Sequence, residues 1–157
     1  MITLVAAISK NNCIGKNNDL PWNIPEDFKH MHKLTLGKVL IMGRKTWESI
    51  PENHRPLQNR TNVVITRNND YELPEGVERY DSIQEALLKH KDEEIVGFGG
   101  QKIFEEMILI ADVLEITHVD QVVEECHAFF PSIDLNVWQE TWRKNYEGFN
   151  FVTYKKI

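Results

Sequence analysis

The chain has 157 residues and a net charge of −6, which together exclude several classes of protein. A chain of this length buries about 68 to 70% of the surface that its unfolded form would expose, so one core can hold it together. The negative charge argues against non-specific nucleic-acid binding, which needs a basic surface. No apolar run approaches the roughly 20 residues that span a bilayer. The short apolar start has no basic leader, so we expect a cytoplasmic protein without membrane partners.

Short apolar runs, rich in β-branched residues, alternate with helical patterns along the chain. The runs cover residues 2–8, 39–42, 62–66, 94–98 and 113–119. They are nearly continuous, which is typical of parallel strands buried on both faces of a sheet. This alternation predicts an α/β fold, and because neither a linker nor a repeat divides the chain, we expect a single domain over residues 1–157.

The first helical pattern, LPWNIPEDFKHMHKL over residues 20–34, aims a carboxylate at its own apolar side. At about 100° per residue, Asp27 falls on the same arc as Ile24, Phe28, Met31 and Leu34, whereas Glu26, Lys29, His30 and Lys33 fall on the opposite arc. An acid in an apolar wall has its pKa raised by desolvation and keeps a proton nearer neutral pH. The alternative is a first-turn acid that only stabilises the helix dipole.

Two further helices and a hairpin complete the prediction. Ser82 and Glu85 form a capping box that opens a helix over residues 82–90, and apolar residues at helical spacing predict another over 101–111. Residues 136–145 and 148–156 predict an antiparallel C-terminal hairpin at the edge of the sheet.

Two predicted strands end in glycine just before a helix. The first turn carries Gly43 and then Arg44 to Thr46, and the second carries Gly99 and Gly100. Free backbone N–H groups at such turns suit phosphate, although either turn alone is most often just a tight connection. The spacing differs from the Rossmann fingerprint. Cationic Arg44, Lys45 and the Thr66-Arg67 pair suit a ribose 2′-phosphate, which favours NADPH over NADH.

The cysteines, Cys13 and Cys126, have no metal-ligand spacing around them. In a cytoplasmic protein we expect them to be free thiols rather than a disulfide, and we expect no metal site.

Ordered motifs along the whole chain carry a resemblance to a known family. They are LVAAIS, LPWNIPEDF, IMGRKTWESI, PLQNR before NVVITR, FGGQKIF, ITHVD and FFP. The chain resembles the bacterial-type dihydrofolate reductases over essentially its full length. This resemblance implies an eight-stranded, mostly parallel sheet with an antiparallel C-terminal strand and four flanking helices. It also implies a monomer that binds dihydrofolate and can bind antifolate inhibitors.

The implied reaction is the reduction of 7,8-dihydrofolate to 5,6,7,8-tetrahydrofolate by NADPH, in support of one-carbon metabolism and thymidylate synthesis. A hydride passes from nicotinamide C4 to pterin C6, and N5 takes a proton. By the same resemblance, Asp27 anchors the pterin, Thr117 supports Asp27, Trp22 holds a bridging water, and Leu20 lies by the nicotinamide.

The resemblance also assigns the two halves of the site. The implied substrate pocket consists of Val5, Ala6, Asp27, Phe28, Met31, Ile50, Leu57, Arg60, Phe98 and Thr117, with Arg60 gripping the α-carboxylate of the glutamate tail. The implied cofactor residues are Ala7, Ile14, Gly15, Leu20, Gly43, Arg44, Lys45, Thr46, Thr66, Arg67, Gly99, Gly100, Gln101, Lys102, Ile103 and Phe104. The family has a cis peptide between the two adjacent glycines.

The sequence departs from the family at Cys126-His127-Ala128, where many relatives carry an aspartate that binds the lid over residues 10–22. We therefore expect a differently balanced lid, although His127 can equally be a plain loop residue. Two other functions stay open at this point. One is a reductase of the same fold that acts on a pyrimidine of flavin synthesis; the other is a non-catalytic nucleotide-binding regulator.

Overall fold

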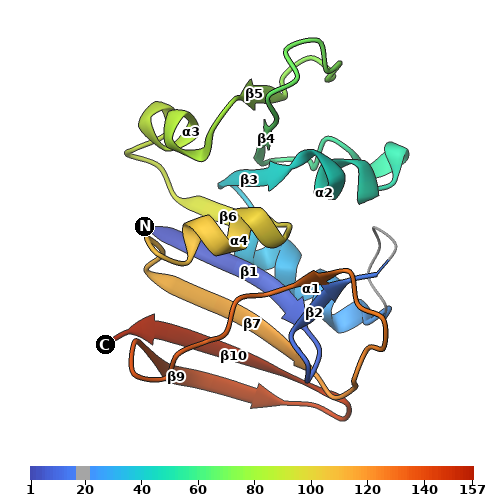
Figure 1. Cartoon of the computed structure of the whole chain (residues 1–157), viewed down its shortest axis with the longest axis vertical. Helices are drawn as coiled ribbons and strands as arrows, with labels where there is room; N and C mark the ends of the chain where they lie inside the picture. Colours follow the sequence, from blue (N-terminus) through green and yellow to red (C-terminus); the bar gives the residue numbers. More distant parts are fainter. Residues whose placement is uncertain (17–21) are drawn as a thin grey trace.

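A computed structural model describes residues 1–16 and 22–157, and its centre is an eight-stranded sheet in the order β5-β4-β3-β6-β1-β7-β10-β9 (Figure 1). The parallel strands are β1 (Ile2–Ile8), β3 (Val39–Gly43), β4 (Thr61–Ile65), β5 (Glu78–Tyr80), β6 (Ile95–Gly99) and β7 (Val113–Val119). β10 (Phe149–Lys156) joins β7 antiparallel, and β9 (Trp138–Asn145) joins β10 antiparallel. The predicted α/β class and the C-terminal hairpin are confirmed.

The continuous apolar runs form strands that are buried on both faces of the sheet, as predicted. Residues 4–8 of β1 are all 5% exposed or less, and residues 39–42 of β3 are 1% exposed or less, so both faces of these central strands are covered. A glycine on β6 makes this possible: a Cβ at Gly97 would lie 2.6 Å from Leu4 Cδ2 and 2.9 Å from Met107 Sδ. The sheet and the helix over it therefore meet at a place where only hydrogen fits.

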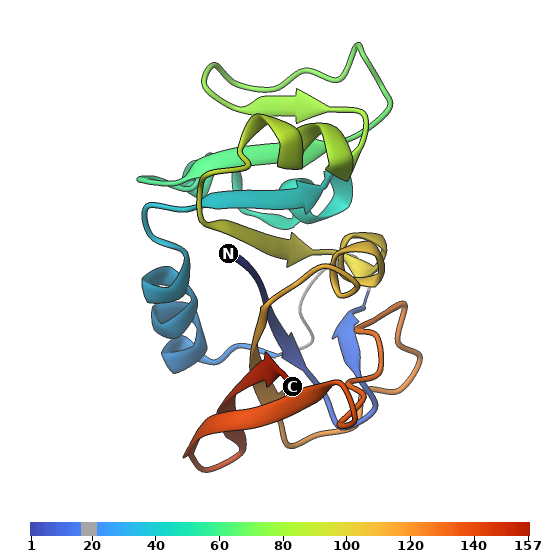
Figure 2. The ribbon, with the colours of Figure 1, turned by 90° about the vertical axis from the view of Figure 1, so that its left-hand side faces the viewer.

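Four helices flank the sheet, as the family resemblance implies. They are α1 (Pro25–Thr35), α2 (Arg44–Ser49), α3 (Ile83–Lys89) and α4 (Gln101–Met107), and a short 3₁₀ turn η1 (Glu52–His54) follows α2. Figure 2 shows α1 and α4 on opposite sides of the sheet. Apolar residues of α3 and α4 belong to one core cluster, whereas those of α1 and α2 pack against the second.

The helix boundaries differ in part from the sequence-based prediction. α1 begins at Pro25, because proline has no N–H to lose at the first helical position. The Ser82 side chain accepts from the Glu85 N–H at 3.2 Å, which confirms the predicted cap of α3. α4 ends at Met107, four residues before the predicted end, and the chain continues as a turn toward β7.

The faces of α1 depart from the helical pattern at two residues. Phe28, on the predicted apolar arc, is 48% exposed because it lines a cleft, as the family resemblance implies. His30 was expected in solvent but is half-buried, since its ring stacks on Phe151 at a centroid distance of 4.0 Å. Glu26, Lys29 and Lys33 are exposed as predicted.

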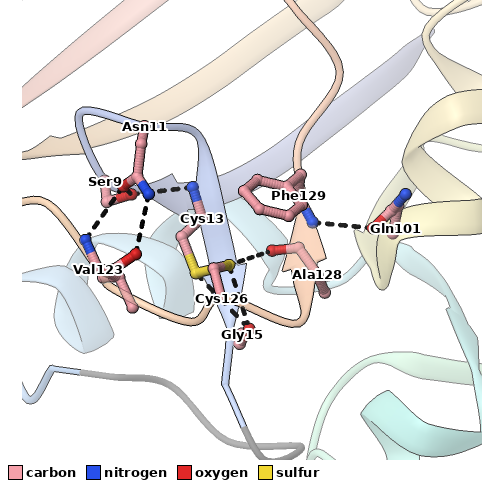
Figure 3. Close-up of a disulfide and its surroundings, with 9 residues drawn as sticks. All are labelled: Ser9, Asn11, Cys13, Gly15, Gln101, Val123, Cys126, Ala128 and Phe129. Carbon is pink, nitrogen blue, oxygen red and sulfur yellow. Dashed lines mark hydrogen bonds between the residues drawn. A yellow bond between two sulfur atoms is a disulfide. The ribbon is translucent and has the colours of Figure 1, made fainter.

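A second, two-stranded sheet was not predicted, and the contact that it creates overturns the free-thiol prediction. β2 (Cys13–Gly15) pairs antiparallel with β8 (Ala128–Phe129). The pairing brings the Cα atoms of Cys13 and Cys126 to 5.9 Å, and the two sulfur atoms form a disulfide (Figure 3). The partners are 113 positions apart in the chain, so their spacing carried no signal of the bond.

None of the helices in the described ranges is both long and apolar enough to cross a membrane.

Candidate active site

A cleft of about 2460 Å³ opens along the carboxyl ends of the parallel strands. Its lining takes residues from the ends of β1, β3, β4 and β6, among them Ala7, Gly43, Thr66 and Gly99. The carboxyl edge of a parallel sheet is where α/β proteins bind ligands, because the loops that leave the strands converge there. The cleft therefore lies where both glycine turns meet the first strand.

A carboxylate lies buried beside this cleft. Asp27 is 1% exposed and Thr117 is 3% exposed, and Thr117 Oγ1 donates a hydrogen bond of 2.5 Å to Asp27 Oδ1. α1 supplies the acid from its first turn, and β7 supplies the hydroxyl next to Ala7 of β1. Neither residue is itself in the lining, but their neighbours Phe28 and Ala7 are. The prediction that Asp27 points inward is confirmed.

This environment changes the acidity of Asp27. Burial raises the pKa of its carboxyl above the ordinary value, because the charged form loses its hydration; the hydrogen bond from Thr117 acts in the opposite direction and is the smaller effect. The folded protein therefore holds a proton on Asp27 at a higher pH than an unfolded chain would. A buried acid with a raised pKa beside a cleft is a candidate for proton chemistry.

The other predicted substrate residues lie together in the lining. They are Val5, Ala6, Phe28, Met31, Ile50, Leu57, Arg60 and Phe98. They make an apolar wall with a single guanidinium among them. Arg60 Nη1 donates to Thr35 Oγ1 at 3.1 Å, and Arg60 Nε donates to the Gln58 carbonyl at 2.9 Å, so the protein holds this side chain in place.

The predicted cofactor residues also line the cleft, at its other half. Those in the described ranges are Ala7, Ile14, Gly15, Gly43, Arg44, Lys45, Thr46, Thr66, Arg67, Gly99, Gly100, Gln101, Lys102, Ile103 and Phe104. The remaining predicted residue, Leu20, lies outside the described residues. The structure thus brings together residues that are far apart in the sequence.

The two glycine turns face each other across this half. The Gly99-Gly100 peptide is cis, as the family resemblance implies, and Gly99 has φ +113°. A Cβ at Gly99 or Gly100 would lie 3.5 or 3.4 Å from Thr46 Oγ1, so side chains there would fill the space between the turns. No side chain caps the start of α2 or of α4, which leaves their first N–H groups available to a ligand. The turns fit a phosphate group.

Cationic side chains surround the first of these turns. Arg44 Nη1 lies 3.1 Å from Glu48 Oε2, and the Tyr71 hydroxyl donates to the same oxygen at 2.7 Å. Lys45 and Arg67 are exposed, and Thr66 is half-buried.

Residues 1–16 and 22–157 contain no group of three His, Cys, Asp or Glu side chains that could hold a metal ion.

Sequence reasoning missed several residues that shape the cleft. Thr35 is 1% exposed; its hydroxyl donates to the Met31 carbonyl one helical turn earlier and accepts from Arg60. The sequence alone does not show that this threonine is buried or that it contacts Arg60. Arg55 donates to the Trp47 carbonyl at 3.0 Å and lies over the Trp47 ring.

His127 and Ala128 also line the cleft, and the His127 N–H donates to the Gly15 carbonyl at 3.1 Å.

This last contact bears on the lid prediction. A backbone hydrogen bond and the Cys13–Cys126 disulfide join the segment around His127 to the start of the predicted lid. The aspartate of many relatives is absent here, as the sequence showed, and the disulfide is a connection that the sequence analysis did not expect. Whether lid motion is rebalanced stays a prediction.

Comparison with known proteins agrees with this geometry. The family model described as "Dihydrofolate reductase" matches residues 1–156. The dihydrofolate reductase of Neisseria meningitidis serogroup B is 48% identical over 143 residues, which cover 90% of this chain and 86% of that protein. Dihydrofolate reductase type 3 of Salmonella typhimurium is 40% identical, with 99% of this chain and 98% of that protein covered.

A solved structure supports the same conclusion. Dihydrofolate reductase from Enterococcus faecalis, complexed with NADP(H) and RAB-propyl, superposes with a TM-score of 0.88 at 33% identity, covering 99% of this chain and 96% of that one. The fold, the cleft and these similarities define an NADPH-dependent oxidoreductase. The chain belongs to the dihydrofolate reductase family, and it reduces 7,8-dihydrofolate to 5,6,7,8-tetrahydrofolate with hydride transfer to C6 and protonation at N5. This membership excludes the reductase of flavin synthesis and the non-catalytic regulator.

The Thr117 hydroxyl is expected to set the pH range of turnover. Thr117→Val removes the hydrogen bond that stabilises the charged Asp27 carboxylate, so the pKa of Asp27 rises and the high-pH fall in kcat/KM moves up by about one pH unit. The measurement is a pH profile of kcat/KM for dihydrofolate. Thr153→Val is the matched control, because Thr153 donates to Glu115 outside the cleft lining. A profile of Thr117→Val that coincides with both the wild type and this control would contradict the assignment.

Proposed function

We propose that Asp27 anchors the pterin ring and promotes protonation of N5. Support comes from the buried Thr117–Asp27 pair beside the cleft, because burying a carboxyl is costly and a polar group of the ligand would offset that cost. A carboxylate that accepts hydrogen bonds from the 2-amino and N3 groups would fix the ring with its C6–N5 bond toward the cofactor. Because burial raises its pKa, the Asp27 carboxyl keeps a proton to a higher pH than an exposed aspartate does, which favours a role in protonation of N5.

Two further groups would complete the substrate side. The apolar wall formed by Phe28, Met31 and Phe98 suits the flat pterin and aminobenzoyl rings. Arg60 is already oriented by Thr35 and is a suitable partner for the carboxylate of the glutamate tail. The buried indole Nε1 of Trp22 donates to no protein group among the described residues, which supports its proposed role in holding a water next to the substrate.

The cofactor half would act by placement. Bound NADPH supplies the hydride, and the hydride chemistry is its own. The glycine turns would receive the phosphates with their N–H groups, while Arg44, Lys45, Thr66 and Arg67 would hold the 2′-phosphate. Ala7 and Ile14 would flank the nicotinamide and exclude water. Holding two rings face to face is the larger part of the rate enhancement in such a site.

We further propose that the enzyme works as a cytoplasmic monomer on small molecules. Its partners would be dihydrofolate, NADPH and antifolate inhibitors, and the net charge of −6 argues against nucleic acid.

Asp27→Asn tests the catalytic assignment. An amide can neither ionise nor take up a proton, so it cannot promote protonation of N5, and kcat/KM for dihydrofolate at neutral pH should fall roughly 10²- to 10⁴-fold. The measurement follows the loss of NADPH absorbance, and thermal unfolding of each variant verifies its fold. Glu26→Gln is the matched control: it removes the neighbouring, exposed acid of the same helix turn and should leave turnover unchanged. Turnover by Asp27→Asn at the wild-type rate would refute the role.

Arg44→Ala and Arg67→Ala test the phosphate site. Each removes a charge-assisted contact to the 2′-phosphate, which corresponds to roughly a tenfold or greater rise in KM for NADPH, whereas KM for NADH stays unchanged. Steady-state kinetics with both cofactors measures the effect. Arg143→Ala serves as the control, because Arg143 pairs with Glu140 on β9, away from the cleft lining. If neither variant weakened the preference for NADPH, the proposed phosphate site would be wrong.

A further inference from the structure

The small sheet beside the cofactor half of the cleft contains Cys13 in β2, and Cys126 lies just before its other strand, β8. β2 and β8 are two short strands, and their register pairs Cys13 with Phe129 and Gly15 with Ala128 (Figure 3). So short a ladder is weak by itself, because two-stranded ribbons are marginal in water. The disulfide between Cys13 and Cys126 adds a covalent bond to a pair of strands that few hydrogen bonds hold.

This bond lies directly behind residues assigned to the cofactor. Ile14 and Gly15, which follow Cys13, line the cleft, and so do His127 and Ala128, which follow Cys126. The His127 N–H donates to the Gly15 carbonyl at 3.1 Å, so the two lining segments are also joined to each other. The disulfide therefore joins two segments whose next residues form part of the wall of the cleft.

A further contact extends the connection to the second glycine turn. The Phe129 N–H donates to Gln101 Oε1 at 2.9 Å, and Gln101 is the first residue of α4, directly after Gly100 (Figure 3). The chain of contacts thus runs from the disulfide through β8 to the turn that faces Thr46. The disulfide is thus connected to the second glycine turn as well as to the wall formed by β2 and β8.

The backbone next to each cysteine supports a conformational role. Asn12 and Glu125, which precede Cys13 and Cys126, have φ of +61° and +53°. Residues other than glycine rarely adopt this conformation, and Glu125 is not of the type that favours it, so surrounding contacts must hold the chain there. The disulfide is one of those contacts, and its loss would let the segment around Glu125 relax.

We propose that Cys13 and Cys126 form a reversible thiol–disulfide modification site that controls the affinity for NADPH by fixing the wall of the cofactor half. This proposal rests on the proposed assignment of Ile14, Gly15 and Gln101 to the cofactor. The disulfide form holds the wall in the arrangement described above and binds NADPH more tightly, because less ordering is needed on binding. The dithiol form binds NADPH more weakly.

The partner in the redox step is a low-molecular-weight disulfide, and the accessible sulfur is that of Cys126. Cys126 is half-buried, whereas Cys13 is 0% exposed. The Cys126 thiolate attacks one sulfur of the small disulfide, and the released thiolate takes a proton. The Cys13 thiolate then attacks the Cys126 sulfur and releases the second small thiol. Two protein thiols and one small disulfide become one protein disulfide and two small thiols, so two electrons pass to the oxidant.

The first test compares NADPH binding by the two forms of the full chain. Treatment with oxidised glutathione or with dithiothreitol, followed by removal of the reagent, gives forms with no titratable thiol and with two. We expect the dissociation constant for NADPH, measured by fluorescence, to be roughly five- to tenfold higher in the dithiol form, and the change to reverse on reoxidation. Cys126→Ser is the matched control and should give the dithiol value after either treatment.

The second test uses reciprocity and does not depend on any variant. If NADPH favours the disulfide form by a given factor, bound cofactor must protect the disulfide by the same factor. NADP⁺ is used because it cannot act as a reductant here. It should raise the value of [GSH]²/[GSSG] at which half of the protein is reduced, by a factor equal to its dissociation constant for the dithiol form divided by that for the disulfide form. A shift of that size supports the proposal, and no shift contradicts it.

Two results would overturn the proposal. One is a dissociation constant for NADPH that differs by less than twofold between the two forms; the other is a protein that still has two titratable thiols after treatment with oxidised glutathione. Such results would leave the catalytic roles untouched, because the effects of Asp27→Asn and Arg44→Ala are measured without any change at the disulfide. Conversely, wild-type turnover by Asp27→Asn would refute the role of the acid while the binding comparison still decided the role of the cysteines.

Discussion

The burial of one carboxyl group against one hydroxyl is the constraint on which the rest of the site depends. Asp27 would be more stable in water, and the fold keeps it 1% exposed only because α1 packs on β1 and the Thr117 hydroxyl reaches its oxygen at 2.5 Å. Desolvation of that group raises its pKa. Burial of this acid costs folding free energy, and a group that is costly to bury and has a raised pKa is typical of an active site, where stability and function often oppose each other.

The second constraint is the meeting of two glycine turns at the carboxyl edge of the sheet. Gly43 and the Gly99-Gly100 pair leave space that side chains would fill, and cationic residues stand around the first turn. The acid and the turns lie on either side of β1, so a single strand sets the position of both halves. The Cys13–Cys126 disulfide joins two segments whose neighbours line the proposed cofactor half, which is why we propose that its redox state affects this half.

Most of the sheet could be predicted because its strands are fully buried and their residues are apolar without interruption, as in Val39–Met42. The site could be predicted where one residue type breaks a local pattern, as Asp27 does in an apolar arc. The disulfide could not, since Cys13 and Cys126 meet only through two very short strands. Periodicity alone could not tell that Phe28 lines the cleft, because it distinguishes apolar from polar faces but not a core from a ligand cleft; the family resemblance supplied that assignment. The role of Thr35 in holding Arg60 depends on tertiary contact alone.

The most direct test of the central claim is the titration of the Asp27 carboxyl itself, followed by carbon NMR in the complex with NADP⁺, with Asp27→Asn used to assign the signal. The account predicts a midpoint clearly above that of an exposed aspartate, and a further upward move when Thr117 is replaced by valine. A midpoint at or below the value of an exposed aspartate would mean that burial does not govern this acid, and the account of its role would be contradicted.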